Sequence, residues 1–240
     1  PLQAHLGRPE RAFLIFLVPH FTSAMAGFGY IWMFYLILVG VETWLVFRAD
    51  IVALAQTSPW PLNVVYRSLA LGVYDVSEEA MEVDHKLIKV LAAIGIPAAA
   101  LLHGYVGFIF GSIKANPWWS TPLMPIVFLF SAIVSGIAIV LLVYMATASW
   151  RGAGIDMRCV DTTARYLLYA FLVDFSLEML DLLHRIYEAE ESFHTLDFMV
   201  QTRLYTSHIL VQIVFGTLAP LALLALTQLV ALEEKARRWI

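Results

Sequence analysis

The chain has 240 residues, of which 60% are hydrophobic and 14% are charged, and its formal net charge is −4. Soluble domains average about 25% charged residues, so this composition excludes an ordinary water-soluble protein. No basic patch accompanies the negative net charge, which excludes a typical nucleic-acid-binding surface. The single cysteine, Cys159, excludes an internal disulfide and any cysteine-ligated cluster carried by this chain alone.

Five apolar runs are long enough to cross a bilayer, since a helical span needs roughly 20 residues. Backbone amides in hydrocarbon must bond within their own segment, which favours helices over other structures. The runs lie at about 22–47, 87–110, 123–148, 164–187 and 206–232. We therefore expect an all-α integral membrane protein with one transmembrane domain over residues 1–240. The odd number of spans and the polar opening loop indicate a piece of a longer chain.

The longest connection between spans covers residues 49–76. We expect a turn at Ser58–Pro61 and a short helix along the membrane interface at about 63–73. Ser77 and the two glutamates after it are typical of a helix start, because the hydroxyl caps an N–H and acids favour the positive end of the dipole. The polar residues just beyond are interpreted as a solvated helix start, with proton uptake as the alternative. They are Glu82, Asp84 and His85.

The distribution of lysines and arginines predicts the orientation, because cytoplasmic loops carry an excess of them. Ten flank one face, namely Arg48, Arg67, Lys86, Lys89, Arg151, Arg158, Arg165, Lys235, Arg237 and Arg238. Five flank the other, namely Arg8, Arg11, Lys114, Arg185 and Arg203. The first face is therefore predicted to be cytoplasmic, and the turn around Lys114 to lie on the outer face.

Ionisable residues within spans indicate function, because each costs several kcal/mol in lipid and usually faces the bundle interior. The fourth span carries Asp174, Glu178, Asp181 and Arg185, which fall on one stripe at about 100° per residue. We interpret the three acids as proton carriers. The alternative is an interhelical hydrogen-bond network with Arg185 paired to Asp181. Glu42 in the first span either continues the proton path or extends towards the headgroups beside the neighbouring arginine, Arg48.

The histidines divide into separate sites. His85 and His103 are 18 residues apart, which amounts to about 27 Å along a helix, so they cannot share one site. His103, His184 and His208 are predicted at comparable depths near the outer ends of their spans. Two of them facing each other would form a b-type haem site, while the alternative is that each one bonds a neighbouring helix.

Residues 101–125, with the sequence LLHGYVGFIFGSIKANPWWSTPLMP, combine the end of a span, a polar-aromatic turn and the start of the next span. This arrangement is typical of a site for an amphiphile such as a quinone. Reducing a quinone consumes protons, so a donor is needed beside each ring oxygen. His103 and Tyr105 are the candidate partners of the ring oxygens. Arg8 and Lys114 are candidates for holding a ring oxygen or a partner subunit, or else contact lipid headgroups.

Two motifs carry a resemblance to a known family. The opening HLGRPERA, residues 5–12, and the stretch HGYVGFIFGSIKANPWWSTPLMP, residues 103–125, resemble the polysulfide reductase membrane-subunit family, also called the NrfD/PsrC family. The closest resemblance is to the DsrP type associated with dissimilatory sulfur metabolism. The motifs cover about 35 residues, and the remainder of the chain agrees with the family in hydropathy.

The resemblance implies a protein of eight to ten spans, built as two four-helix bundles, in the inner membrane of a prokaryote. It implies a subunit that binds menaquinone or ubiquinone, holds no haem or metal of its own, and is not an enzyme by itself. Electrons would be exchanged with a ferredoxin-like iron–sulfur subunit on the outer face, and beyond it with a multihaem cytochrome c or a molybdenum enzyme. Tyr105 matches the family position of a quinone-pocket tyrosine.

Two other classes of protein remain open. One is a haem b quinol oxidoreductase subunit that uses His103 together with His184 or His208. The other is a proton-coupled secondary transporter, in which the buried acids would couple protons to a solute. Transporters commonly show paired broken helices in two related halves, and the sequence shows no matching halves.

Overall fold

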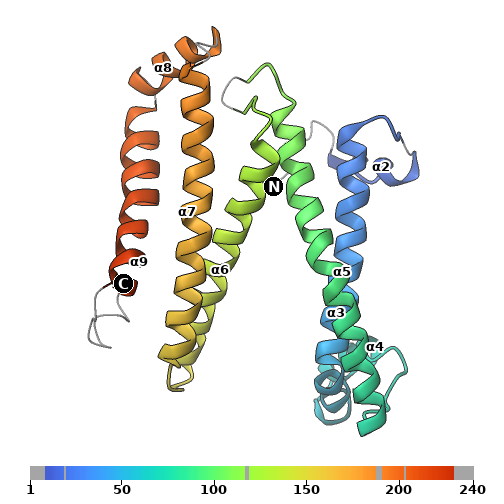
Figure 1. The fold of residues 1–240 in the computed structure, drawn as a ribbon. Helices are drawn as coiled ribbons and strands as arrows, with labels where there is room; N and C mark the ends of the chain where they lie inside the picture. The colour runs from blue at the N-terminus through green and yellow to red at the C-terminus, as the bar shows by residue number, and fades with distance from the viewer. Residues whose placement is uncertain (1–8, 19, 117–118, 188–190, 203, 230–240) are drawn as a thin grey trace. The chain divides into compact units, whose positions relative to one another are not determined.

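The computed structural model describes residues 9–18, 20–116, 119–187, 191–202 and 204–229. Every described element is helical, as expected (Figure 1). In chain order they are the 3₁₀ turn η1 (Pro9–Arg11), α2 (Leu14–Leu17), α3 (Ala24–Thr57), α4 (Leu62–Leu69), α5 (Glu78–Gly111), α6 (Met124–Trp150), α7 (Met157–Tyr187), α8 (Glu191–Thr202), the π-helix η2 (Tyr205–Leu218) and α9 (Ala219–Leu229).

Four of the described helical segments are long and apolar enough to cross a membrane, which fits a chain with several spans. They are Ala24–Thr57, Glu78–Gly111, Met124–Trp150 and Tyr205–Leu229. The first two extend well beyond the runs predicted from hydropathy, because polar residues continue both helices past the apolar stretch. The third agrees with its predicted run within two residues at each end.

The fourth predicted span, 164–187, lies within α7 and is helical throughout. It is not among the four apolar helices, because its acids and arginines make it too polar by composition alone. Two of its charged side chains, Asp174 and Arg185, are nevertheless buried against protein. We therefore treat α7 as a helix whose polar groups face its neighbours.

The chain divides into two compact units, residues 1–102 and residues 103–240, with the division falling inside α5. The first unit contains α3, the short α4 and most of α5. The connection between α3 and α4 follows the prediction, since a turn after Thr57 leads into a short helix over Leu62–Leu69. Trp44 on α3 donates its indole N–H to the carbonyl oxygen of Leu69, 2.8 Å away, and so holds the end of α4 against α3.

The helix start predicted at Ser77 and the two glutamates after it is confirmed. α5 begins at Glu78, and the backbone N–H of Ala80 donates to Ser77 Oγ at 3.4 Å. Ser77 in turn donates its own N–H to Asp75 Oδ1 at 2.9 Å. Hydrogen bonds from the Ser77 backbone and then from its side chain lower the pKa of the exposed Asp75 carboxyl below its usual value. The loop therefore enters α5 through two consecutive side-chain caps.

The interpretation of Asp84 as part of a solvated helix start is wrong. Asp84 is buried, and its carboxylate binds the guanidinium of Arg48 on α3. Glu82 and His85 on either side of it are exposed, as expected for the other two members of that group. The burial follows from helix geometry, because Asp84 alone of the three faces α3.

The second unit is built from α6 and α7, which run antiparallel, with α9 and the π-helix continuing beside α7 (Figure 1). The end of α5, residues 103–111, and the turn that leads to α6 complete one end of this unit. α8 lies at the same end, after the last turn of α7, and packs against the π-helix. The segments that hold His103, Glu178 and His208 therefore belong to one compact body.

Candidate functional site

A cavity of about 880 Å³ lies among the elements of the second unit, and we name it the main cavity. Ligand pockets for small molecules typically measure roughly 300–1,000 Å³. Its apolar lining consists of Met124, Val127, Phe128, Ala132, Phe175, Met179, Leu182, Ile186, Phe193, Val200, Ile209 and Ile213. Its polar lining consists of His103, Trp119, Thr121, Ser131, Ser135, Glu178, Asp181, Arg185, Asp197, His208, Gln212 and Thr217.

Two glycines bring the end of α5 against the start of α6 and so place His103 at the cavity. A Cβ atom on Gly107 would lie 2.6 Å from the Met124 carbonyl oxygen and 2.6 Å from Pro125 Cα. A Cβ atom on Gly111 would lie 2.7 Å from the Thr121 carbonyl oxygen. The contacts are with backbone, so only glycine fits. Small residues four positions apart serve the same purpose in other membrane helix pairs.

Aromatic rings fill the space between α5 and α6 next to these glycines. The ring of Phe110 stacks on Phe128 with centroids 5.5 Å apart, and it meets Trp119 edge-on with centroids 5.0 Å apart. Phe128 and Trp119 also line the main cavity. The aromatic cluster therefore forms one apolar wall of the cavity. Trp119, which the sequence places at the membrane boundary, is part of this wall.

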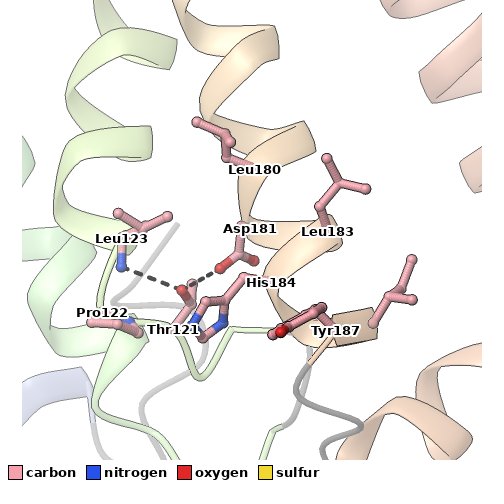
Figure 2. A pocket seen from close by; sticks show the side chains of 9 residues that line it. Thr121, Pro122, Leu123, Leu180, Asp181, Leu183, His184 and Tyr187 are labelled. Atoms are coloured by element: carbon pink, nitrogen blue, oxygen red, sulfur yellow. Dashed lines mark hydrogen bonds between the residues drawn. The ribbon is translucent and has the colours of Figure 1, made fainter.

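Asp181 on α7 joins the α5–α6 turn to the rest of the site. Thr121 donates its hydroxyl to Asp181 Oδ1, and Arg185 Nε donates to Asp181 Oδ2 at 2.8 Å. Thr121 Oγ1 also accepts the backbone N–H of Leu123 at 3.3 Å (Figure 2). The pairing of Arg185 with Asp181, which was the alternative interpretation of these residues, is present.

A second cavity of about 760 Å³ lies beside this hydrogen-bonded group, and we name it the side cavity. Figure 2 shows it lined by the α5–α6 turn and the last turns of α7. Its lining residues are Thr121, Pro122, Leu123, Leu180, Asp181, Leu183, His184, Ile186 and Tyr187. Thr121 and Asp181 line both cavities, so the two cavities adjoin at their hydrogen bond.

The polar stripe of α7 divides between two environments. Glu178, Asp181 and Arg185 line the main cavity, whereas Asp174 does not. Asp174 is buried, and its Oδ1 has no hydrogen-bond partner among the described residues. Helical periodicity therefore grouped these side chains correctly on one face, but only three of the four reach the cavity.

The π-helix contributes polar groups to the main cavity that sequence reasoning did not select. Gln212 and Thr217 line it beside His208. His208 Nδ1 lies 3.0 Å from Gln212 Oε1, and Thr217 donates its hydroxyl to the Gln212 carbonyl oxygen at 3.0 Å. A search for α-helical periodicity does not place residues 208 and 217 on one face, so the usual signal for a shared site was absent.

A profile of the family described as "Polysulphide reductase, NrfD" matches residues 2–238, which is nearly the whole chain. The chain belongs to the NrfD family. The resemblance in the two sequence motifs is thereby confirmed at the level of the family, and the chain is a multi-pass membrane protein.

Curated relatives of this NrfD-family chain include proteins from bacteria and an archaeon. A selenate reductase subunit of Mesobacillus selenatarsenatis is 32% identical over 145 residues, which cover 58% of this chain and 34% of that protein. Protein NrfD of Escherichia coli is 31% identical over 140 residues, with coverages of 58% and 40%. A putative dimethyl sulfoxide reductase membrane subunit of Halobacterium salinarum is 32% identical over 139 residues, with coverages of 58% and 29%. The matched region thus spans between 29% and 40% of the length of these relatives.

The residues predicted for a quinone pocket in this NrfD-family chain lie in different places. His103 lines the main cavity, and Tyr105 on the same helix does not, its ring packing instead 5.7 Å from that of Phe108. Lys114 is exposed in the turn between α5 and α6, and Arg8 lies outside the described residues. Their roles remain predictions.

Glu42, the proton-path candidate of the first span, lies in the first unit. A Cβ atom on Gly95 of α5 would lie 3.9 Å from Glu42 Oε2, so the Glu42 carboxylate lies beside Gly95. Its predicted neighbour Arg48 binds Asp84 and the carbonyl oxygen of Asp75. Arg48 is therefore engaged with other groups, and the role of Glu42 in a proton path remains a prediction.

The three histidines predicted at comparable depth separate into two groups. His103 and His208 line the main cavity, whereas His184 lines the side cavity. The described residues contain no group of three or more histidine, cysteine, aspartate or glutamate side chains arranged to hold a metal ion. Of the two haem pairings suggested by the sequence, His103 with His208 is the one whose members share a cavity.

The main cavity has the features that a quinone requires. Its apolar side chains match a fused or alkylated ring and tail, and its histidines, acids, arginine and amide offer donors and acceptors to ring oxygens. Carboxylates and imidazoles are also the side chains that most often act as general acids and bases. The residues present therefore fit an amphiphilic ligand that takes up and releases protons.

Proposed function

We propose that this chain is the quinone-reactive membrane subunit of a respiratory oxidoreductase complex, and that its quinone occupies the main cavity. The observation that carries the proposal is the composition of that cavity. His103, Glu178 and Asp181, selected from sequence for quinone binding or proton transfer, line one volume large enough for a ring system. Bound quinone supplies two-electron, two-proton redox chemistry, and this chain supplies the binding surface and the proton-exchanging groups.

His103 is the proposed hydrogen-bond partner of one ring oxygen, because imidazole both donates and accepts near neutral pH. Glu178 is the proposed group that exchanges the proton within the cavity. Asp181 is held by Thr121 and Arg185, and its proposed role is to position the turn and pass protons along the wall. Asp174 and Glu42 are proposed carriers further from the cavity, while Tyr105, Arg8 and Lys114 remain candidate contacts of the quinone or of a partner subunit.

The proposed partners are a ferredoxin-like iron–sulfur subunit on the outer face and, beyond it, a molybdenum enzyme or a multihaem cytochrome c. The names of the relatives, which include selenate reductase and dimethyl sulfoxide reductase subunits, support a place in a reductase complex. The motif resemblance to the DsrP type adds sulfur compounds to the candidate substrates. The proposed location is the inner membrane of a prokaryote.

A second candidate function follows from one specific observation. His103 and His208 line the same cavity, so a haem b held between them is the competing occupant. That function predicts a cytochrome spectrum from this subunit, which a haem-free quinone site does not give.

The deciding experiment purifies the complex from its membrane, separates the subunits and records a reduced-minus-oxidised visible spectrum of this one. The proposal expects no b-type band, together with quinone in an organic extract of the intact complex. A b-type band that is lost in His103→Ala and His208→Ala would establish the haem function instead. His184→Ala is the matched control, because His184 lines the side cavity.

A further inference from the structure

The wall of the main cavity formed by Tyr205–Leu218 has an unusual winding. This segment is π-helical over 14 residues, whereas π-helices usually occur as single turns, often at functional sites. The hydrogen bonds of a π-helix run from residue i to i+5, so one turn takes between roughly four and five residues. The winding therefore changes which side chains share a face.

The difference decides whether Thr217 reaches the cavity. His208 and Thr217 are nine residues apart. In an α-helix with 3.6 residues per turn, nine residues make about two and a half turns and place the two on opposite sides. In a π-helix the same nine residues make about two complete turns and place them on one side. Both residues line the main cavity, whereas Phe215, which an α-helix would align with His208, does not.

Hydrogen bonds along this face join His208 to the side chain of Gln212 and Thr217 to its backbone. Thr217 donates to the carbonyl oxygen of Gln212, five positions earlier, a spacing that belongs to the π-helix. Gln212 Oε1 is an acceptor, so His208 Nδ1, 3.0 Å away, must carry the proton and donate it. The Gln212 amide nitrogen carries two N–H donors.

We propose that the π-helical face of His208, Gln212 and Thr217 is the binding site for one ring oxygen of the quinone, an inference that rests on the proposed function. The Gln212 amide donates to this oxygen, while its side chain is held by His208 and its backbone carbonyl by Thr217. The same donor serves both redox states, because a quinone carbonyl oxygen and a hydroquinone hydroxyl oxygen both accept hydrogen bonds. His103, on α5, serves the other ring oxygen.

The test measures binding to the whole purified complex in detergent. The probe is 2,3-dimethyl-1,4-naphthoquinone, followed through quenching of tryptophan fluorescence, since Trp119 lines the cavity. Gln212→Leu and Thr217→Val are each expected to weaken binding about tenfold, because the first removes the proposed donor to the ring oxygen and the second removes the hydroxyl that holds the Gln212 backbone. Thr217→Ser, which keeps the hydroxyl, is expected to bind like the unmodified protein.

Phe215→Leu is the matched control for the winding. Phe215 is 69% exposed and does not line the cavity, so its replacement is expected to leave binding unchanged. If Phe215→Leu weakened binding and Thr217→Val did not, the face would follow an α-helix and the proposal would be overturned. Thermal unfolding of each variant shows whether weaker binding comes from the lost contact or from a disrupted helix.

The remaining outcomes separate this inference from the proposed function. Weaker binding in His103→Ala, combined with unchanged binding in Gln212→Leu and Thr217→Val, would overturn the inference and leave the quinone site in place. Failure of the unmodified complex to bind the probe would overturn both.

Discussion

Arg48 on α3 and Asp84 on α5 form a buried ion pair, with Arg48 Nη2 2.6 Å from Asp84 Oδ2. Arg48 is 3% exposed and Asp84 6% exposed. Arg48 Nη1 also donates to the carbonyl oxygen of Asp75, 2.6 Å away, and so ties the loop before α5 to the same pair. Three segments of the first unit, one end of α3, the loop and the start of α5, are therefore joined at one charged group.

Removing one partner of this pair is expected to destabilise the protein strongly. Arg48→Met leaves the Asp84 carboxylate buried without its counter-ion, which costs about 3–5 kcal/mol of unfolding free energy. Unfolding of the purified protein in detergent, followed by circular dichroism, measures the loss. Replacing both residues, Arg48→Met with Asp84→Leu, is expected to recover most of it, because no charge then remains buried.

The control for this prediction is the exposed pair Glu82–Lys86 on α5. Its side chains are 69% and 72% exposed, so Lys86→Ala is expected to change stability by less than about 1 kcal/mol. A loss in Arg48→Met no larger than that of Lys86→Ala would contradict the inference that the buried pair holds the three segments together.

Gly107 is expected to tolerate no side chain. Its Cβ position lies 2.6 Å from backbone atoms of Met124 and Pro125, so Gly107→Ala must push the start of α6 away from α5. Overpacking of this kind costs about 1–3 kcal/mol. Gly136→Ala is the matched control, since nothing lies within 4 Å of that position and alanine favours a helix. The thermal unfolding temperature is expected to fall for Gly107→Ala and not for Gly136→Ala. Equal unfolding temperatures of the two variants would refute the close approach of α5 and α6 at Gly107.

Glu178 is expected to be needed for quinone reduction or oxidation by the complex. Glu178→Gln keeps the shape of the side chain in the main cavity but removes the carboxyl group that exchanges a proton. Loss of a positioned acid or base typically lowers the rate about 10²–10⁴-fold. Steady-state turnover with a soluble quinone measures the effect, with Asp50→Asn, at an exposed position of α3, as the control. Turnover in Glu178→Gln equal to that of the control would exclude Glu178 from proton exchange.

The sequence predicted the helices and pointed to a few of the side chains that line the main cavity, for reasons visible in particular residues. Span periodicity grouped Glu178, Asp181 and Arg185 on one face of α7, and all three line the main cavity. The motif around residue 103 identified the segment where α5 meets α6. Both signals depend on regular helical geometry, which local sequence largely determines.

Other features depended on packing between helices and could not be predicted in the same way. The burial of Asp84 follows from its neighbour Arg48, which is 36 residues earlier in the chain. Thr217 was missed because it shares a face with His208 only in a π-helix, whereas Gln212, four residues after His208, lies on the same face in an α-helix and was overlooked. The placement of His184 in a different cavity from His103 and His208 likewise depends on how the helices pack.

Asp174 tests whether the polar face of α7 carries protons beyond the cavity. Among the described residues its buried Oδ1 has no hydrogen-bond partner, so the neutral and nearly isosteric Asp174→Asn is expected to leave thermal unfolding almost unchanged. If Asp174 is a proton carrier, the same change slows proton uptake relative to quinone turnover. The complex reconstituted in liposomes with an internal pH dye measures both rates together. Asp50→Asn, at an exposed position of α3, is the control.

A proton-to-quinone ratio that is the same in Asp174→Asn, Asp50→Asn and the unmodified complex would remove Asp174 from the proton path. It would leave Glu178 and Asp181 as the acids of α7 to be considered, because they are the ones in contact with the cavity.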